Sequence, residues 1–470
     1  MSREKEFAKN TLILAIGRYF PKIFALITIP IVTAELTKSE YGTYDLITTL
    51  VSLLLPIVTL QIQSAAFRFL IDARGDEEKS GKIISNIFFF TITTSTITVI
   101  TYFLIYNQVP VVSRLLICGY FFADIIYLML GQIARGLSYN KIYSTGAIIV
   151  SFMNATLIFV TLKVVNYGLN GVLFAYFVAQ VVACIYIIYK IKLRPYIKTR
   201  DVSKSVLKEL ISYSWPMIPN NLSSWILNIS DRIIITSVCG PEANAVYAVA
   251  NKIPYLLSDA QSIMVMGWQE NASIAANDKD SSDYYSKMFE TMFKLVISAT
   301  YALVAATPIM FKILIKGDYS DAYGEMPILI VAMFFYCMSA FLGGIYVAYK
   351  KTKSVAWTTA LAAVINFVIN ILLVKKLGIR AGSLSTLVAY VFLFVYRMFD
   401  VLKIKKIKYN YAELVILVGV LVIMNGMTFQ RNIMLDIINM AIALLMIIVC
   451  NKTLLYNICK GTMKKVRRRK

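Results

Sequence analysis

The sequence predicts an all-α integral membrane protein with about fourteen transmembrane helices, built as two parallel six-helix repeats and two extra C-terminal helices. The first observation is composition, since 58% of the 470 residues are hydrophobic, compared with roughly 45–50% in soluble domains. The second is that apolar runs of about 20 residues, the length that spans a bilayer, recur along the whole chain. The third is a half-length internal repeat, which is typical of membrane transporters.

The apolar runs give the elements in order, with an uncertainty of a few residues at each boundary. We expect spans at 11–34, 43–64, 82–106, 110–133, 143–165, 169–190, 211–238, 242–267, 288–311, 325–349, 354–374, 381–402, 411–429 and 433–450. This order predicts one six-helix repeat at 1–190, a basic linker at 191–209 and a second repeat at 210–402. Two additional helices at 403–450 and a basic tail at 451–470 complete the chain.

The repeat is visible as matching residues in the two halves. A shift of 203 aligns Tyr44 with Tyr247 and Gly42 with Ala245, while Asn154 before Gly168 corresponds to Asn366 before Gly378. Because six spans separate the two copies, both repeats begin on the same side of the membrane. They are therefore expected to be parallel repeats, related by an axis along the membrane normal.

The net charge of +22, from 48 basic and 26 acidic residues, would suggest nucleic-acid binding in a soluble protein. Here the basic residues lie mainly between apolar spans, so membrane orientation and contact with anionic lipids are simpler explanations. With Met1 placed in the cytoplasm, only nine of the 48 basic residues fall in the segments and span ends on the opposite side. The sequence therefore predicts a multi-pass protein with both termini cytoplasmic and no nucleic-acid partner.

Several classes of function are disfavoured by what the sequence lacks. It has no histidine, its six cysteines form no CxxC pair, and no phosphate-binding loop or soluble segment long enough for an ATPase is present. We therefore expect no catalytic residues, no metal site and no cofactor, and a transporter that uses a proton or sodium gradient. A membrane-embedded glycan polymerase stays an alternative, although such enzymes often carry larger extracytoplasmic loops.

Four basic residues belong to neither side in this count and lie within spans, where charge is costly and indicates function. Arg18 and Lys22 share one face of the first helix, whereas Arg232 and Lys252 lie in the seventh and eighth spans. Arg18 is about 12 Å into its span at 1.5 Å per residue, which is deep for a side chain reaching back to the headgroups. We expect these cations to line a water-filled cavity and to bind an anionic substrate, phosphate in particular.

Acidic residues in the spans are candidates for ion coupling. Asp231 is adjacent to Arg232, which favours a structural ion pair over titration or sodium binding. Asp124 has no obvious local partner and is the better coupling candidate. Asp259 lies seven residues after Lys252 and shares its face.

Three further residues are possible supports of the cavity. Arg68 and Arg135 lie near cytoplasmic ends of spans, where the positive-inside rule explains them unless a cavity opens there. Asn221 occupies the position of Arg18 in the second repeat.

Two short motifs resemble those of Wzx-type polysaccharide flippases, and they occur along the chain in the same order as in that family. They are Tyr41-Gly42-Thr43-Tyr44 in the first repeat and Asn251-Lys252-Ile253-Pro254 after Asp231 and Tyr247 in the second. These flippases belong to the multidrug/oligosaccharidyl-lipid/polysaccharide exporter superfamily, together with MATE transporters and lipid II flippases. The resemblance implies a V-shaped pair of six-helix bundles around a central cavity that works by alternating access.

The resemblance also implies a substrate and a location. The substrate would be an undecaprenyl-pyrophosphate-linked oligosaccharide, such as an O-antigen unit of lipopolysaccharide or a capsule unit, moved across the bacterial cytoplasmic (inner) membrane. A polysaccharide polymerase and a chain-length regulator would be partners. Arg18, Lys22, Arg232 and Lys252 would then meet pyrophosphate or acidic sugar, although the charges of the two repeats do not match. The alternative is an ion-coupled multidrug exporter of the superfamily, but the mixed-to-basic charge of the spans argues against it.

Overall fold

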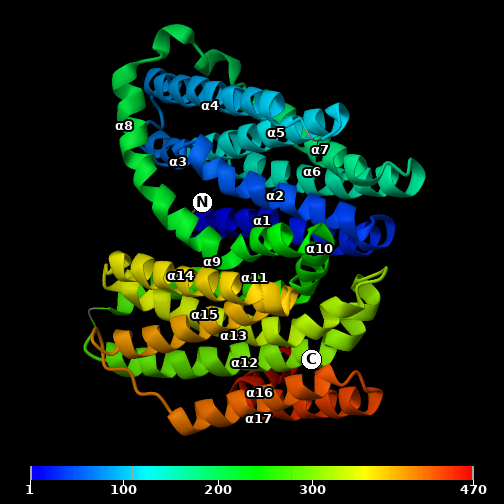
Figure 1. Ribbon diagram of the computed structural model, residues 1–470. Helices are drawn as coiled ribbons and strands as arrows, with labels where there is room; N and C mark the ends of the chain where they lie inside the picture. The colour runs from blue at the N-terminus through cyan, green and yellow to red at the C-terminus, as the bar shows by residue number, and fades with distance from the viewer. Residues whose placement is uncertain (1–2, 108, 277, 468–470) are drawn as a thin grey trace. The chain divides into compact units, whose positions relative to one another are not determined.

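The computed structural model describes the backbone of residues 3–107, 109–276 and 278–467, and α-helices dominate it (Figure 1). The chain divides into two compact units, Met1–Trp225 and Ile226–Lys470. The division falls inside helix α9 (Ile218–Cys239). Each unit is described by itself.

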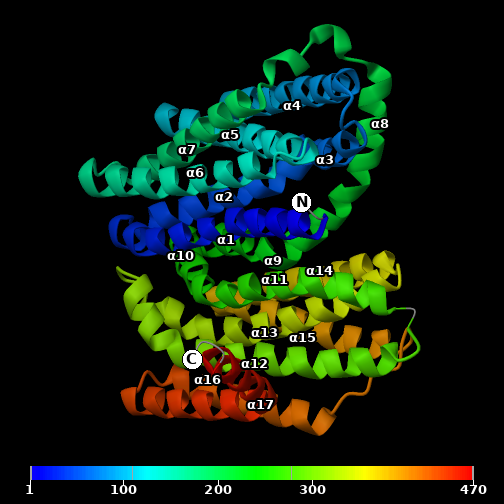
Figure 2. The same ribbon diagram turned by 180° about the vertical axis from the view of Figure 1, so that it is seen from behind.

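The first unit is a bundle of long helices crossed at one end by a shorter one. Its helices are α1 (Arg3–Glu35), α2 (Lys38–Val58), α3 (Ile62–Asp72), α4 (Glu77–Ile105), α5 (Val111–Gly136), α6 (Asn140–Phe159), α7 (Gly168–Ile191) and α8 (Lys204–Ser214). A π-helical turn, Val160–Val164, continues α6. Helix α8 runs across the ends of its neighbours and contacts α3 and α4 (Figures 1 and 2).

Local sequence signals explain how the bundle's helices begin and end. Thr37 and Glu40 form a capping box at the start of α2, with N···O distances of 3.0 and 3.2 Å. The same Glu40 accepts a hydrogen bond from the backbone N–H of Leu169 at 3.2 Å, which ties the α1–α2 turn to the start of α7. The predicted span 43–64 is interrupted after Val58, because Leu60 and Gln61 adopt left-handed backbone conformations with φ of 46° and 56°.

The predicted linker 191–209 is folded against the first unit. It contains two 3₁₀ turns, Arg194–Tyr196 and Thr199–Asp201, followed by the first part of α8. Ser85 and Asn86 on α4 bind its backbone through four hydrogen bonds of 2.8–3.0 Å, to Tyr196, Lys198, Asp201 and Ser203. The segment therefore forms an ordered cover on one end of α4.

The second unit packs around α13, which has the largest buried share among the helices that could span a membrane. Besides most of α9 it comprises α10 (Pro241–Ala250), α11 (Lys252–Ala275), α12 (Ser281–Leu314), α13 (Ser320–Ala348), α14 (Thr352–Leu377), α15 (Ile379–Val401), α16 (Tyr411–Phe429) and α17 (Ile433–Arg467). Helices α16 and α17, the predicted additional pair, pack against α12. Helix α17 bends at Asn451 and continues into the predicted tail as far as Arg467.

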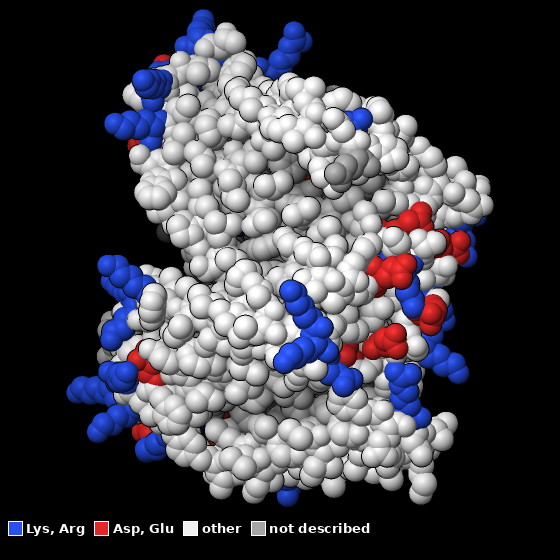
Figure 3. Space-filling view, in the orientation of Figure 1, with Lys and Arg blue, Asp and Glu red and all other residues white. Residues whose placement is uncertain are grey.

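The membrane class predicted from the sequence is confirmed. Among the described residues, twelve helices are long and apolar enough to cross a bilayer. The other two predicted spans, 211–238 and 242–267, correspond to α9 and to the α10–α11 pair, whose polar and charged residues lower their hydropathy. A break at Asn251 separates α10 from α11 and makes Lys252 the first residue of α11. Charged side chains gather mostly towards helix ends and leave broad uncharged sides (Figure 3).

Candidate functional site

The second unit holds a carboxylate deep among its helices. Asp231 on α9 is 2% exposed and accepts hydrogen bonds from three neutral side chains. They are Tyr247 on α10 at 2.8 Å, Asn370 on α14 at 2.6 Å and Thr386 on α15 at 2.7 Å. Asn366 on α14 donates to the Thr386 hydroxyl at 3.2 Å. We call these five residues the Asp231 cluster.

The packing of α15 on α9 and α10 creates this cluster. A Cβ atom at Gly382 would lie 2.9 Å from Ile235 and 3.0 Å from the Tyr247 ring, so only glycine allows this close approach. Thr386 follows one helical turn later and reaches Asp231. Asn366 and Asn370 are also one turn apart, which places both on one face of α14.

Two oxygen atoms of the cluster lack hydrogen-bond donors. The side-chain oxygens Oδ1 of Asn366 and Asn370 are buried and have no hydrogen-bond partner among the described residues. The cluster therefore offers a carboxylate, two amide oxygens and two hydroxyl oxygens in one buried place. Such oxygen-only sets suit hard cations, and a protonated carboxyl group could equally donate to an amide oxygen.

A second layer of hydrogen bonds holds the site in place. Asn228 lies three residues before Asp231 on α9. Its side-chain oxygen accepts from the Tyr390 hydroxyl at 2.6 Å, and its backbone oxygen accepts from the Tyr255 hydroxyl at 3.2 Å. Tyr390 follows Thr386 by one turn of α15, so one stripe of that helix serves both layers.

The first unit has polar groups of a different kind. Asp124 on α5 accepts a hydrogen bond from Gln180 on α7 at 2.7 Å. The hydroxyls of Tyr44 and Tyr176 are 2.6 Å apart. The repeat aligns Tyr44 with Tyr247 but puts Thr28 where the second unit has Asp231, and the Thr28 hydroxyl donates to its own helix at Ala25. The two units are therefore not equivalent at this position.

Three buried charged residues were not predicted from the sequence as candidate site residues. Asp45 on α2 is 3% exposed, Glu325 on α13 is 3% exposed and Arg397 on α15 is 4% exposed. Glu325 lies 3.4 Å from Arg380. Arg397 is inside the predicted span 381–402, and that position within an apolar run was the signal that could have revealed it.

The predicted basic cavity residues are divided between the two units. Arg18 is exposed on α1, and the Lys22 ammonium lies 5.6 Å from the centre of the Tyr19 ring. Arg232 on α9 and Lys252 at the start of α11 are half-buried. A shared cationic cavity stays a prediction.

The remaining predicted residues occupy varied surroundings. Arg68 forms an exposed ion pair with Asp72 at 2.6 Å, and this carboxylate raises the pKa of Arg68. Arg135 stacks on the rings of Phe67 and Tyr143, at 4.6 and 5.4 Å. Asn221 on α9 and Asp259 on α11 are half-buried. Among the predicted site residues, Asp231 is the one whose described hydrogen bonds join α9 to α10, α14 and α15.

Comparisons with known proteins agree on the class of protein. A family model described as "Polysaccharide biosynthesis protein" matches residues 7–268. No curated protein gives a significant match. The structure is similar to the lipid II flippase MurJ in an inward closed conformation, with a TM-score of 0.75, 15% identity, and coverage of 95% of this chain and 100% of that one.

Two transporters of the MOP superfamily are also similar. An inward-facing multidrug resistance MATE family transporter has a TM-score of 0.66 at 15% identity, covering 83% of this chain and 98% of that one. A MOP superfamily transporter from Pyrococcus furiosus has a TM-score of 0.58 at 15% identity, covering 84% and 96%. At this identity the likeness establishes the fold.

Proposed function

Because the chain belongs to the polysaccharide biosynthesis protein family, we propose that it is a flippase for lipid-linked oligosaccharides, driven by an ion gradient. It is a multi-pass membrane protein with the fold of MOP superfamily flippases and transporters. The proposed substrate is an undecaprenyl-pyrophosphate-linked repeat unit of O-antigen, capsule or a related polysaccharide. It moves from the cytoplasmic to the outer leaflet of the bacterial cytoplasmic membrane, with both termini of the protein in the cytoplasm.

The Asp231 cluster is the observation that supports coupling of transport to an ion gradient. A buried carboxylate is costly unless its charge is compensated, and the three donors of Asp231 are all neutral. A proton or a sodium ion bound there would remove the net negative charge. Since α9, α10, α14 and α15 all supply ligands, binding would favour the conformation in which these helices are packed together.

The basic residues supply the expected contacts to the substrate. Arg18 and Lys22 on α1, with Arg232 and Lys252 in the second unit, would bind pyrophosphate or acidic sugar during passage. Arg135, Arg68 and Asn221 would support them. Asp124 and Asp259 are the further candidates for coupling. A polysaccharide polymerase and a chain-length regulator would receive the product outside.

Transfer across liposomes tests this proposal. The purified protein is reconstituted with fluorescent undecaprenyl-pyrophosphate oligosaccharide, and its transfer is followed with and without an imposed proton or sodium gradient. We expect gradient-stimulated transfer that falls at least about tenfold in Arg18→Ala and Lys252→Ala, as loss of a charge-assisted contact implies. Efflux of a small organic cation without any glycan transfer would contradict the flippase and favour a drug exporter.

The coupling site has its own prediction. Asp231→Asn keeps the size of the side chain but removes its charge, so transfer should no longer respond to the gradient. In detergent, thermal unfolding of the wild type should shift upward with sodium or with falling pH, because a cation that binds the folded state more tightly than the unfolded state stabilises the folded state. Asp231→Asn should abolish this shift, whereas Asp283→Asn, an exposed carboxylate on α12, should retain it. An unchanged shift in Asp231→Asn would exclude the cluster as the coupling site.

A further inference from the structure

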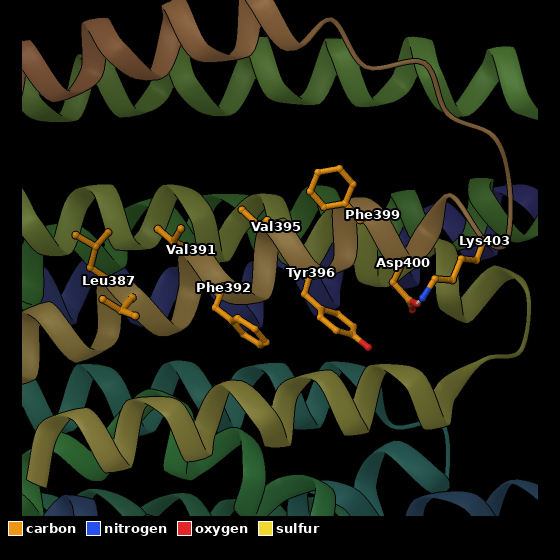
Figure 4. Close-up of a pocket in the computed structure, with 9 residues that line it drawn as sticks. Leu387, Val391, Phe392, Val395, Tyr396, Phe399, Asp400 and Lys403 are labelled. Atoms are coloured by element: carbon orange, nitrogen blue, oxygen red, sulfur yellow. Dashed lines mark ion pairs between the residues drawn. The ribbon is translucent and has the colours of Figure 1, made fainter. Parts of the chain in front are cut away.

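The outer face of α15 carries a long apolar groove that ends in an ion pair. The groove has a volume of about 670 Å³ and is lined from Leu387 to Lys403. Figure 4 shows its side chains along one helix, with Phe392 and Tyr396 on one side and Phe399 on the other. At its end the Lys403 ammonium lies 3.1 Å from the Asp400 carboxylate.

The groove arises from the two faces of α15. Tyr390, Leu393 and Arg397 are buried against the unit, whereas the stripe through Val388, Val395 and Phe399 is 39–53% exposed. Because α15 is long and apolar enough to cross the membrane, we expect this exposed apolar stripe to face hydrocarbon. From Leu387 to Asp400 it extends for about 20 Å at 1.5 Å per residue, more than the roughly 15 Å of one leaflet's hydrocarbon. A complete acyl chain can therefore lie along it.

A neighbouring helix fixes the polar end of the groove. The hydroxyl of Tyr346 on α13 donates to Asp400 at 2.9 Å and fixes the carboxylate, which is 21% exposed. Lys403 is 77% exposed and forms an ion pair with Asp400. That carboxylate raises the pKa of Lys403, so the amine remains charged. The groove thus ends in one anchored negative charge beside one solvent-exposed positive charge.

We propose that this groove binds a phosphatidylethanolamine molecule, with its acyl chain along α15, its phosphate on Lys403 and its ammonium on Asp400. A paired carboxylate and ammonium complement a headgroup that itself carries both charges. An anionic lipid or a pyrophosphate carrier would place extra negative charge beside Asp400, which like-charge repulsion disfavours. The lipid site is separate from the proposed transport of glycan, so each can fail without the other.

Native mass spectrometry of the full chain in detergent tests the proposal. Phosphatidylethanolamine, phosphatidylcholine and phosphatidylglycerol with identical acyl chains are titrated separately. We expect one tightly bound phosphatidylethanolamine. Its affinity should fall about fivefold or more in Asp400→Asn and in Lys403→Gln, since each removes a charge-assisted contact. Val391→Trp should abolish binding because the indole fills the groove.

Two further variants separate headgroup recognition from damage to the fold. Tyr346→Phe removes the hydrogen bond that anchors Asp400 but keeps both charges, so binding should weaken less than in Asp400→Asn. Lys406→Gln changes a nearby exposed lysine outside the groove and should have no effect. Equal binding of the three lipids, unchanged in all variants, would contradict the proposal and show that the groove contacts lipid without recognising the headgroup. Preference for phosphatidylglycerol would also overturn the proposal, in favour of an anionic lipid.

Discussion

Arg397 shows how a single charged side chain is accommodated within this helical core. Its guanidinium donates to the Ser339 backbone oxygen on α13 at 3.0 Å and to the Thr358 and Thr359 hydroxyls on α14 at 2.9–3.1 Å. A bond of 3.2 Å to the Val355 carbonyl completes the set. Within the described part of the chain it forms no ion pair. The fork geometry of arginine, rather than a counter-charge, therefore holds α13, α14 and α15 together.

This geometry predicts that lysine cannot replace Arg397. An ammonium cannot reach acceptors on both neighbouring helices at once, so Arg397→Lys should lower the free energy of unfolding by about 1–3 kcal/mol. Thermal unfolding in detergent measures the change. Arg68→Lys, which alters an exposed pair on α3, should cost less than about 0.5 kcal/mol. Equal effects of the two substitutions would contradict the role assigned to Arg397.

At the scale of elements, close helix packing decides where the functional groups meet. Gly382 lets α15 approach α9 and α10, and the next turns of α15 bring Thr386 to Asp231 and Tyr390 to Asn228. The position of Asp231 inside an apolar helix was evident from the sequence. Its partners on α14 and α15 were not evident from the sequence, because they lie more than 130 residues away along the chain. The local pattern of apolar and polar residues carries no information about such distant contacts.

Gly382→Ala tests this dependence. The added methyl group would lie about 3 Å from Ile235 and Tyr247 and should destabilise the protein by about 1–3 kcal/mol through overpacking. It should also weaken the cation-dependent shift in unfolding, because Thr386 moves away from Asp231. Gly419→Ala on α16 is the matched control. A Cβ there meets nothing within 4 Å, so alanine should stabilise the helix by up to about 1 kcal/mol. Loss of stability in both variants would argue against a specific contact at Gly382.

Helix breaks were the elements that sequence patterns predicted least well. The span expected at 43–64 is cut at Leu60 and Gln61, two residues that carry no turn signal. The span expected at 242–267 is divided at Asn251, three residues before Pro254, whose missing N–H interrupts the helical hydrogen bonds. Apolar periodicity reports which residues can lie in a membrane, whereas a break depends on how neighbouring helices pack. The order of the apolar spans followed from hydropathy, and the interruption at Leu60 and Gln61 did not.

At the scale of the whole molecule, the distribution of basic residues makes a prediction about orientation. The connections assigned to the cytoplasm hold most of the 48 lysines and arginines, and the folded segment 191–209 is one of the most basic. By the positive-inside rule we expect this segment to face the cytoplasm. We then expect the connection at 239–241, whose Cys239 is exposed, to lie outside.

Labelling with a membrane-impermeant maleimide tests this orientation. In a variant that keeps Cys239 and has the other five cysteines replaced by serine, intact cells should be labelled without permeabilisation. Moving the single cysteine to the linker, as Cys239→Ser with Lys198→Cys, should make labelling depend on permeabilisation, because the reagent cannot cross the bilayer. The cysteine-free protein sets the background. The reverse pattern would invert the topology and, with it, the direction of transport proposed for the glycan, since the basic linker would then face the leaflet to which the substrate is delivered.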